Sequence, residues 1–408
     1  MIGNEDLIRV LKLWNPWEKE ISSGIRRDNY IGQIMHMMKR KEIIVLKGIR
    51  RSGKSTIMKQ IMNELIGSDV KRQQILYLNL EDYQFKDSLD VNLFELALES
   101  YLNYSKNKGK IYYFIDEIQN VRGWERYLRT KYDRGDNIKF IITGSNASLL
   151  SKELSSLLTG RNITFQVRTL SFPEFRMFSR NGKIDEYLTY GGFPEVVLEK
   201  DDVNKKVLLQ QYFEDIINKD IISRHSIRNV EMVFNLARYV IENSGRKTSL
   251  NKLGKSFGVS DDTISTYLSY MMDSFLIVKV PFFSYSLKKR HSAAAQPKYY
   301  ATDNGLVNVC SLKFSEDLGK KYENSVFLRI YNLTSDISYW SGENEVDFIY
   351  DKKAVNVTSG ETIPEREFEG LDEFSKTNKG FKLVLIAKKG SVAKDGIEVL
   401  SFEDFMMS

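Results

Sequence analysis

The sequence contains a single cysteine and no apolar run long enough to cross a membrane, which takes roughly 18 residues. Cys310 has no second cysteine with which to form an internal disulfide, as is usual in the reducing cytoplasm. The N-terminal segment MIGNEDLIRVLKLWNPWEKE carries acidic residues and two tryptophans, so it does not resemble a signal peptide. We therefore expect a cytoplasmic protein without membrane contact.

A strong charge of one sign is also missing. The chain has 60 Lys and Arg against 54 Asp and Glu, a net charge of +6. This balance is compatible with nucleic acid as a partner but is too weak to establish one. Internal repeats and low-complexity linkers are absent from the 408 residues, which are too many for one compact core. Two or three globular domains are expected.

The first part of the sequence alternates short apolar runs with amphipathic helical patterns. The alternation predicts an α/β fold with a parallel sheet covered on both faces. Expected strands are the apolar run IIVLK and the segments at 75–82, 111–120, 139–146 and 163–172. Helices are expected between them, the last of these ending at Thr159.

The segment GIRRSGKST at 48–56 matches the phosphate-binding pattern G-x-x-x-x-G-K-[ST] and lies between an expected strand and an expected helix. Glycines let backbone N–H groups face phosphates at a helix N-terminus, where the helix dipole favours an anion. We expect ATP and Mg²⁺ here, bound by Gly48, Arg51, Ser52, Gly53, Lys54, Ser55 and Thr56, with Ser55 on the metal. The sequence does not explain Arg50 and Arg51: contact with phosphate and contact with a neighbouring subunit are both compatible with it, and the loop fold would tolerate other residues at these positions.

Acidic and polar residues follow two further strands. Asp116 and Glu117 end the strand YYFID, where Asp116 is expected to hold Mg²⁺ and Glu117 to orient or deprotonate the attacking water. Asn146, or Ser145 beside it, either positions that water or caps a helix. Arg161 either stabilises charge at a neighbouring subunit's nucleotide or is a surface arginine near a helix C-terminus.

After Pro173 the pattern becomes mostly helical up to about residue 275. A helix, a tight turn with Ser260 as N-cap and a second helix precede two short aromatic strands around a basic segment, an order that predicts a winged helix-turn-helix. Lys288, Lys289 and Arg290 lie in the wing as possible DNA phosphate contacts. Asp261 and Asp262 at the start of the second helix would repel phosphates, so packing is an equal alternative. Ala293–Ala295 interrupt the basic segment for no reason visible in the sequence.

The segments GIRRSGKST, IYYFIDEIQNVRGWERYLRTKYD, FIITGSNASLLSKELSSLLTGR, LSFPEF and YLTYGGFPEVV resemble a prokaryotic family of AAA+ ATPases. Its members carry an AAA domain, a helical lid, a winged helix and a C-terminal restriction-endonuclease-like domain of the DUF4143 type. The resemblance implies ATP hydrolysis and a homo-oligomer, as a ring or cluster, in which Arg161 acts in trans. The implied divisions are an extension (1–30), the ATPase core (31–175), the lid (176–228), the winged helix (229–310) and the nuclease-like domain (311–408).

The nuclease-like part departs from the pattern that nuclease chemistry needs. Restriction-like endonucleases use an acid on the first helix, an Asp on a core strand and Glu-x-Lys on the next, so that carboxylates hold the metal beside a lysine. Glu323 and Asp347 fit the first two positions, but Asn356 and Thr358 stand where Glu and Lys are required. We expect a vestigial site in which Glu323 and Asp347 are a structural pair.

Three functions are compared on this basis. The first is an AAA+ ATPase that uses Mg·ATP to drive movement, with DNA as the expected target. The second is a nucleotide-gated oligomeric switch, as in signalling or defence, that recruits a partner. The third, favoured least because of Asn356 and Thr358, is an active ATP-dependent nuclease.

Overall fold

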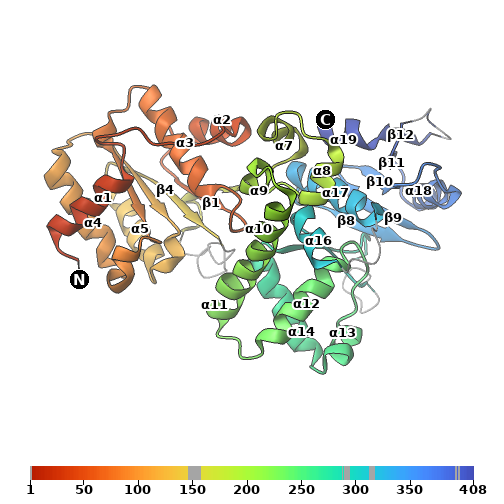
Figure 1. Cartoon of the computed structure of the whole chain (residues 1–408). Coiled ribbons are helices and arrows are strands. Elements are labelled where there is room, and N and C mark those ends of the chain that lie inside the picture. The colour runs from red at the N-terminus through yellow and green to blue at the C-terminus, as the bar shows by residue number, and fades with distance from the viewer. Residues whose placement is uncertain are drawn as a thin grey trace. The chain divides into compact units, whose positions relative to one another are not determined.

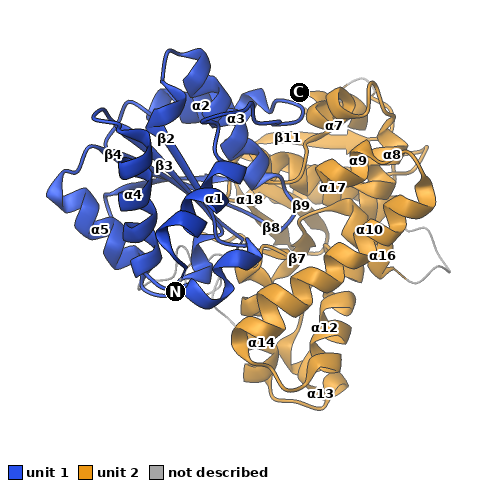
Figure 2. Ribbon diagram, turned by 60° about the vertical axis from the view of Figure 1, so that its left-hand side comes forward, with its two compact units in different colours: residues 1–167 blue, residues 168–408 orange. Residues whose placement is uncertain are grey.

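The chain folds into two compact units, residues 1–167 and 168–408 (Figure 2). The computed structural model describes all residues except 1, 146–157, 287, 289–294, 312–317, 391–392 and 394–395. Each unit has its own sheet and its own buried core. No helix in the described ranges is both long and apolar enough to cross a membrane.

A five-stranded parallel sheet forms the centre of the first unit, in the order β2-β3-β4-β1-β5 (Figure 1). Its strands are β1 (Ile43–Lys47), β2 (Ile75–Asn79), β3 (Ile111–Asp116), β4 (Ile138–Gly144) and β5 (Asn162–Gln166). The predicted parallel α/β fold is confirmed. All five carboxyl ends lie at the same edge of the sheet because the strands are parallel.

The fifth strand is shorter than its apolar pattern predicted. It ends at Gln166, and Phe172 belongs instead to the next helix, α7 (Phe172–Phe178). Ser171 caps this helix, since its backbone N–H and hydroxyl both bond to the Glu174 carboxylate at 3.0 and 3.1 Å. Pro173 in the first turn supports the helix start. The capping sequence therefore outweighs the β-like run of apolar residues.

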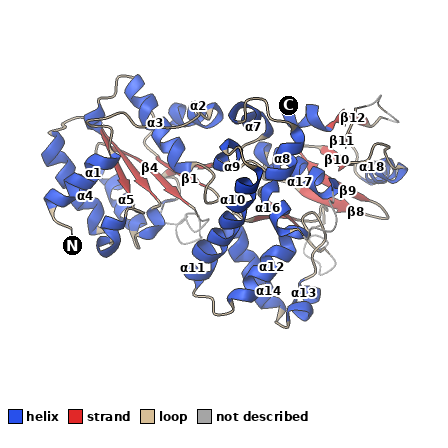
Figure 3. Cartoon of the chain, viewed as in Figure 1, coloured by secondary structure: helices blue, strands red, loops and turns tan. Residues whose placement is uncertain are grey.

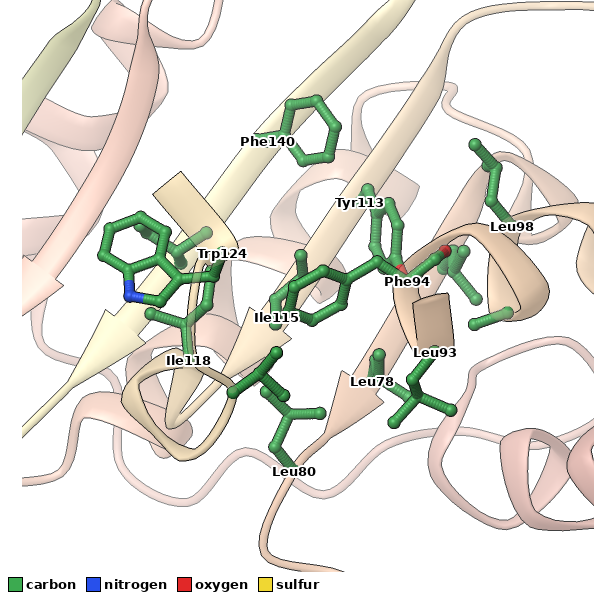
Figure 4. Close-up of a cluster of buried hydrophobic side chains, with 14 of the residues drawn as sticks. Leu78, Leu80, Leu93, Phe94, Leu98, Tyr113, Ile115, Ile118, Trp124 and Phe140 are labelled. Atoms are coloured by element: carbon green, nitrogen blue, oxygen red, sulfur yellow. The ribbon is translucent and has the colours of Figure 1, made fainter. Parts of the chain in front are cut away.

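Alternation along each strand sends neighbouring side chains to opposite faces of the sheet. In β1, Ile43 and Val45 join a core under one group of helices, whereas Ile44 and Leu46 join a second core under another group. Figure 4 shows the first of these cores, including Leu78 and Phe94. Helices α1 (Asn4–Trp14), α4 (Asn92–Ser105) and α5 (Trp124–Arg134) contribute to the first core, and α2 (Asp28–Met37) and α3 (Lys54–Gly67) to the second. Three short 3₁₀ turns, η1 (Arg72–Gln74), η2 (Tyr83–Ser88) and η3 (Ile118–Asn120), complete the unit's described elements.

The N-terminal segment is part of the first unit's core. Asn15 closes the free edge of β2, because its amide donates to the Tyr77 carbonyl (2.8 Å) and its carbonyl accepts from the Tyr77 N–H (2.6 Å). Trp17 is buried and stacks on Tyr101. The segment thus protects an edge strand whose exposed backbone groups would otherwise attract other strands.

The second unit begins with helices (Figure 3). After α7 come α8 (Ile184–Tyr190), α9 (Pro194–Leu198), α10 (Asp202–Asp215), the π-helical turn η5 (Ile216–Ile222), α11 (Ser223–His225), α12 (Val230–Glu242), α13 (Leu250–Phe257) and α14 (Asp261–Asp273). The predicted N-cap is confirmed: the Ser260 hydroxyl accepts the Thr263 N–H at 3.2 Å. An antiparallel ribbon of β6 (Ile277–Val280) and β7 (Lys298–Ala301) follows, then α16 (Asn304–Cys310).

A mixed sheet ends the second unit, in the order β12-β11-β10-β9-β8. It contains β8 (Ser338–Ser341), β9 (Glu345–Tyr350), β10 (Lys353–Val357), β11 (Lys382–Ala387) and β12 (Glu398–Ser401). Pairs β8–β9 and β9–β10 are antiparallel, whereas β10–β11 and β11–β12 are parallel. Helices α17 (Leu318–Leu333) and α19 (Phe402–Met407) pack into one of its cores and α18 (Glu365–Thr377) into the other.

The chain leaving the ribbon is joined to this sheet through the backbone. The Phe283 N–H donates to the Tyr339 carbonyl (2.6 Å), and the Tyr339 N–H donates to the Pro281 carbonyl (3.0 Å). Helices α12 to α14, the ribbon and the C-terminal sheet therefore form connected parts of one unit.

Candidate functional site

The loop between β1 and α3 takes a conformation that only glycine tolerates at its first position. Gly48 has φ +154°, and a Cβ atom there would lie 1.9 Å from the Val167 carbonyl oxygen. Gly53 has φ +95° and caps α3. Two positive-φ glycines thus curl the backbone around the N-terminus of a 14-residue helix.

Lys54 lies inside the loop whose backbone these two glycines bend. Its ammonium donates to the carbonyls of Gly48 (3.2 Å) and Ile49 (3.1 Å), and it is 3.8 Å from a Glu117 carboxylate oxygen. Only 4% of its side chain is exposed. The two carbonyls accept hydrogen bonds without neutralising the ammonium, and the Glu117 carboxylate lies beyond hydrogen-bond distance.

Asp116 and Glu117, at the end of β3, differ in their hydrogen-bond partners and backbone conformation. Asp116 accepts the hydroxyls of Tyr77 (2.6 Å) and Thr143. Glu117 adopts φ +54°, an unusual value for a residue with a side chain. Its backbone N–H donates to the Thr143 hydroxyl at 2.9 Å, so one threonine at the end of β4 orients both acids.

The two acids also differ in proton affinity. Burial and the neighbouring Glu117 charge raise the pKa of Asp116, against the hydroxyls of Thr143, Tyr77 and Ser55. Burial acts to raise the pKa of Glu117 as well, but the Lys54 charge and the Gln119 amide outweigh it and the pKa falls. Of the two acids, Glu117 is therefore the one that loses its proton more readily.

The residues present suit a nucleotide with its metal ion. The Ser52 hydroxyl is buried beside Gly48 without a hydrogen-bond partner among the described residues, as expected of a group awaiting a ligand. The Ser55 hydroxyl is close enough to Asp116 to lower the pKa of that carboxyl, so the two oxygen ligands that Mg²⁺ prefers lie near each other. Thr56, one residue further in α3, is partly buried.

Asn146 lies outside the described residues, but its neighbour Ser145 is buried at the end of β4. The Gln119 amide donates to the Ser145 hydroxyl (3.3 Å) and also to the Glu117 carboxylate. Sequence reasoning missed both Gln119 and Thr143. The usable signal was their position, each within three residues of a predicted site residue at the carboxyl end of a strand.

Arg161 lies at the amino end of β5, where its carbonyl accepts the Ile43 N–H. Strand β1 separates this end from the phosphate loop by five residues, or roughly 17 Å at about 3.3 Å per residue. The guanidinium bonds to Asp133 of α5 at 2.9 Å. Arg161 therefore cannot reach the phosphate loop of its own chain.

A second cluster of charges lies in the other unit. Lys298 of β7 contacts the carboxylates of Glu323 (3.5 Å), Glu345 (2.5 Å) and Asp347 (3.6 Å), with 2% of its side chain exposed. Burial alone would lower the pKa of Lys298, but these three carboxylates raise it. Burial and the neighbouring Glu323 charge raise the pKa of Asp347.

This cluster assembles the predicted vestigial residues around a lysine that the sequence did not point to. Glu323 and Asp347 both contact Lys298. Asn356 lies beside them and donates its amide to the carbonyls of Glu345 (3.2 Å) and Glu367 (3.0 Å). Thr358 is buried at the end of β10. Among the described residues, no group of three or more His, Cys, Asp or Glu side chains is arranged to hold a metal ion.

The expected wing residues are only partly visible. Lys288 is exposed, whereas Lys289, Arg290, Ala293 and Ala294 lie outside the described residues. Ala295 is half-buried. Asp261 and Asp262 are exposed at the start of α14, as the sequence suggested.

Comparison with known proteins agrees with the loop geometry. The family model described as "AAA domain" matches residues 40–176, and one described as "Domain of unknown function (DUF8612)" matches residues 181–317. Among solved structures, the chain aligns with the Aeropyrum pernix ORC1 protein in complex with DNA (TM-score 0.33, 10% identity, 73% of this chain, 94% of that one). It also aligns with C. elegans PCH-2 (TM-score 0.28, 14% identity, 60% and 67%). At these TM-scores neither structure informs the fold or function of this chain.

Two curated relatives match over almost their whole length. An uncharacterized protein of Haemophilus influenzae is 30% identical over 404 residues, which cover 94% of this chain and 98% of the relative. An uncharacterized protein of Methanocaldococcus jannaschii is 32% identical over 437 aligned positions, covering 99% and 93%. The chain belongs to the prokaryotic family of AAA-domain proteins that includes these two relatives.

Proposed function

We propose that the protein is an ATPase of the AAA+ class that binds Mg·ATP at residues 48–56 and hydrolyses it. The observation that supports this most directly is the position of Lys54, which is buried among loop carbonyls with Glu117 3.8 Å away. A triphosphate entering the loop would replace neutral carbonyls as the partner of the ammonium, so binding gains a charge-assisted contact.

Each site residue has a distinct part in the proposed reaction. Loop N–H groups and Lys54 bind the phosphates, and Ser55 with Asp116 would hold Mg²⁺. The metal ion, when bound, neutralises charge on the phosphates. Glu117 orients the attacking water and accepts its proton, which the lowered pKa of this carboxyl permits at neutral pH. Gln119 and Ser145 position Glu117.

Substitution at Lys54 and Glu117 tests this assignment. Lys54→Ala should abolish binding of a fluorescent ATP analogue, and normal turnover in that variant would sink the proposal. Glu117→Gln should bind ATP with unchanged affinity and reduce kcat by about 100-fold or more, in the range typical of general-base removal. Arg9→Ala, which removes an exposed ion pair in α1, serves as the control.

We further propose that Arg161 acts in trans within a homo-oligomer. Arg161 is paired with Asp133 on the surface and is too far from its own loop, which supports a role at a neighbouring subunit. Arg161→Ala should lose turnover while keeping ATP affinity. Mixing it with Glu117→Gln should partly restore turnover, since some interfaces then contain both groups, and normal turnover of Arg161→Ala alone would contradict the assignment.

The output that we favour is movement on DNA. We assign residues 176–228 to a helical lid, 229–310 to a winged helix and 311–408 to a nuclease-like domain. The order of α12, α13, α14 and the β6–β7 ribbon supports the winged helix. A nucleotide-gated switch is the alternative, and the Lys298 cluster favours it because the lysine already contacts the carboxylates that nuclease chemistry would need for a metal ion.

ATP hydrolysis measured with and without duplex DNA separates these outputs. Stimulation by DNA of severalfold or more supports movement on DNA, and DNA-insensitive turnover supports the switch. An active nuclease would nick plasmid with Mg²⁺ or Mn²⁺ and lose that activity in Asp347→Ala. We expect no nicking by the unmodified protein.

A further inference from the structure

Arg50 lies in the phosphate loop but is held by a residue of another loop. Its guanidinium donates to the Glu81 carboxylate at 3.1 Å. The Arg50 side chain is 16% exposed, whereas the next residue, Arg51, is exposed. A guanidinium that is largely shielded from solvent is usually paired, as Arg50 is with Glu81.

The charge of Arg50 also acts on the proposed general base. Burial acts to raise the pKa of Glu117, and Arg50 is one of the groups, after Lys54 and Gln119, that bring it down. Arg50 thus lies close enough to both Glu81 and Glu117 to interact with each.

Glu81 begins a segment that is hydrogen-bonded to Trp14 and carries an exposed aromatic side chain. The next residue, Asp82, accepts the Trp14 indole N–H at 2.7 Å and caps the turn η2 by accepting the Gln84 N–H at 2.9 Å. Tyr83, the first residue of η2, is 83% exposed. The segment from Glu81 to Ser88, which we name the β2 segment, is therefore tied to the phosphate loop through Arg50.

We propose that Arg50 is a second phosphate-binding cation, held by Glu81 until ATP arrives and then transferred to the γ-phosphate. The Glu81 side chain is 51% exposed, and ion pairs this exposed contribute little. A phosphate group offers a guanidinium two oxygens and more charge, so it wins the competition. Loss of the Arg50 contact frees Glu81, and the β2 segment with Tyr83 thereby senses whether ATP or ADP is bound.

This inference rests on the proposed ATPase function, and two substitutions with opposite effects test it. Arg50→Ala should lower ATP affinity about tenfold and leave ADP affinity within about twofold, because only ATP carries the γ-phosphate. Glu81→Gln should raise ATP affinity a few fold, because it removes the competitor for Arg50. Arg50→Lys should fall between wild type and Arg50→Ala. Arg9→Ala is the matched control for loss of an ion-paired arginine.

Trp14 supplies a readout that does not depend on turnover. In the Glu117→Gln background, ATP should change the intrinsic fluorescence and ADP should not. Trp14→Phe should remove the change, which assigns it to the β2 segment, and Arg50→Ala should remove it too. The far-ultraviolet circular dichroism of each variant establishes that it is folded, and Arg50→Lys is used if Arg50→Ala is not.

The outcomes separate the two proposals. If the unmodified protein binds no nucleotide, the ATPase proposal fails and this inference fails with it. If it binds and hydrolyses ATP, but Arg50→Ala and Arg50→Lys leave the ATP-to-ADP preference and the fluorescence change intact, only the role of Arg50 is overturned. Equal loss of ATP and ADP affinity in Arg50→Ala and Glu81→Gln also overturns it, because that result describes a purely structural ion pair.

Discussion

Two of the buried lysines, Lys54 in the first unit and Lys298 in the second, differ in their partners. Lys54 contacts two backbone carbonyls and one carboxylate at 3.8 Å, whereas Lys298 contacts three carboxylates within 3.6 Å. Their side chains are 4% and 2% exposed, so burial does not distinguish them. The hydrogen bonds of Lys54 go to neutral carbonyls that an incoming anion can replace, whereas Lys298 contacts three carboxylates.

The comparison separates a binding site from an internal ion cluster. Carbonyl oxygens satisfy an ammonium without neutralising it, and they can be exchanged for phosphate oxygens at small cost. Carboxylates compensate the desolvation of a buried lysine, and removing one partner leaves unpaired charge in the interior. We therefore expect substitutions at Lys54 to change ligand binding and those at Lys298 to change stability.

Lys298→Met should have the largest effect on stability. It leaves Glu323, Glu345 and Asp347 without their shared cation, and breaking a buried ion pair costs about 3–5 kcal/mol of unfolding free energy. Lys54→Met should lose less, about 1–3 kcal/mol, because it removes two bonds to carbonyls and a single carboxylate contact at 3.8 Å. Urea unfolding of both variants measures the difference, and equal losses would break the distinction between the two lysines.

The loss in Lys298→Met should depend on pH with a predictable sign. The pKa of Asp347 is already raised by burial and Glu323 although Lys298 opposes that shift, so removing the lysine raises it further. A carboxyl whose folded-state pKa is raised binds its proton more readily when folded, and its contribution to stability is lost as pH rises. Unfolding measured at pH 5 and pH 8 should therefore show the greater deficit at pH 8.

Asn356→Asp should have the next largest effect. The Asn356 amide donates to the Glu345 and Glu367 carbonyls, and a carboxylate can donate to neither. Unsatisfied buried partners cost about 1–3 kcal/mol, before any repulsion from the neighbouring acids. Thermal unfolding against wild type tests this value. A gain in stability on adding Mn²⁺ to Asn356→Asp would instead indicate that the cluster still favours a metal ion.

A matched pair of tyrosines should give the smallest effects. Tyr300 donates to Glu323 and Tyr77 donates to Asp116, both at 2.6 Å. Tyr300→Phe should lose about 1.5 kcal/mol of unfolding free energy, the lower end of the range for a hydrogen bond to a charged group. Tyr77→Phe should shift the Mg²⁺ concentration needed for ATP binding as well, because Asp116 loses a donor. A shift in metal dependence for Tyr300→Phe would contradict the comparison.

The sequence predicted one of these sites much better than the other. The phosphate loop is local, since its glycines, Lys54 and Ser55 are neighbours in the chain and the loop needs only a strand before it and a helix after it. Asp116 and Glu117 follow from the same frame of parallel strands. The Lys298 cluster draws its cation from a ribbon 25 residues before Glu323 and its acids from separate elements. No local pattern marks such a lysine, because only tertiary packing brings it to the carboxylates.

The same dependence on tertiary packing explains which other residues and boundaries the sequence did not predict. Thr143 and Gln119 carry no motif of their own and take part because β4 and η3 place them beside the acids. The partner of Arg50 was also not predictable, since Glu81 follows β2 and Arg50 follows β1. These strands are not neighbours in the sheet, so only tertiary packing brings the two loops together. The fifth strand was predicted too long because the capping box at residues 171–174 starts a helix there, despite the apolar character of the segment.

The left-handed backbone of Glu117 has a consequence for how this chain can change over time. Glu117 has φ +54°. A residue with a Cβ atom at such a φ value is less stable than glycine by about 1–2 kcal/mol of conformational free energy. Selection for thermal stability alone would thus favour replacement of Glu117 by glycine or asparagine. A thermostabilised descendant of this protein is expected to gain its stability elsewhere if it keeps hydrolysing ATP, and to lose this glutamate first if it does not.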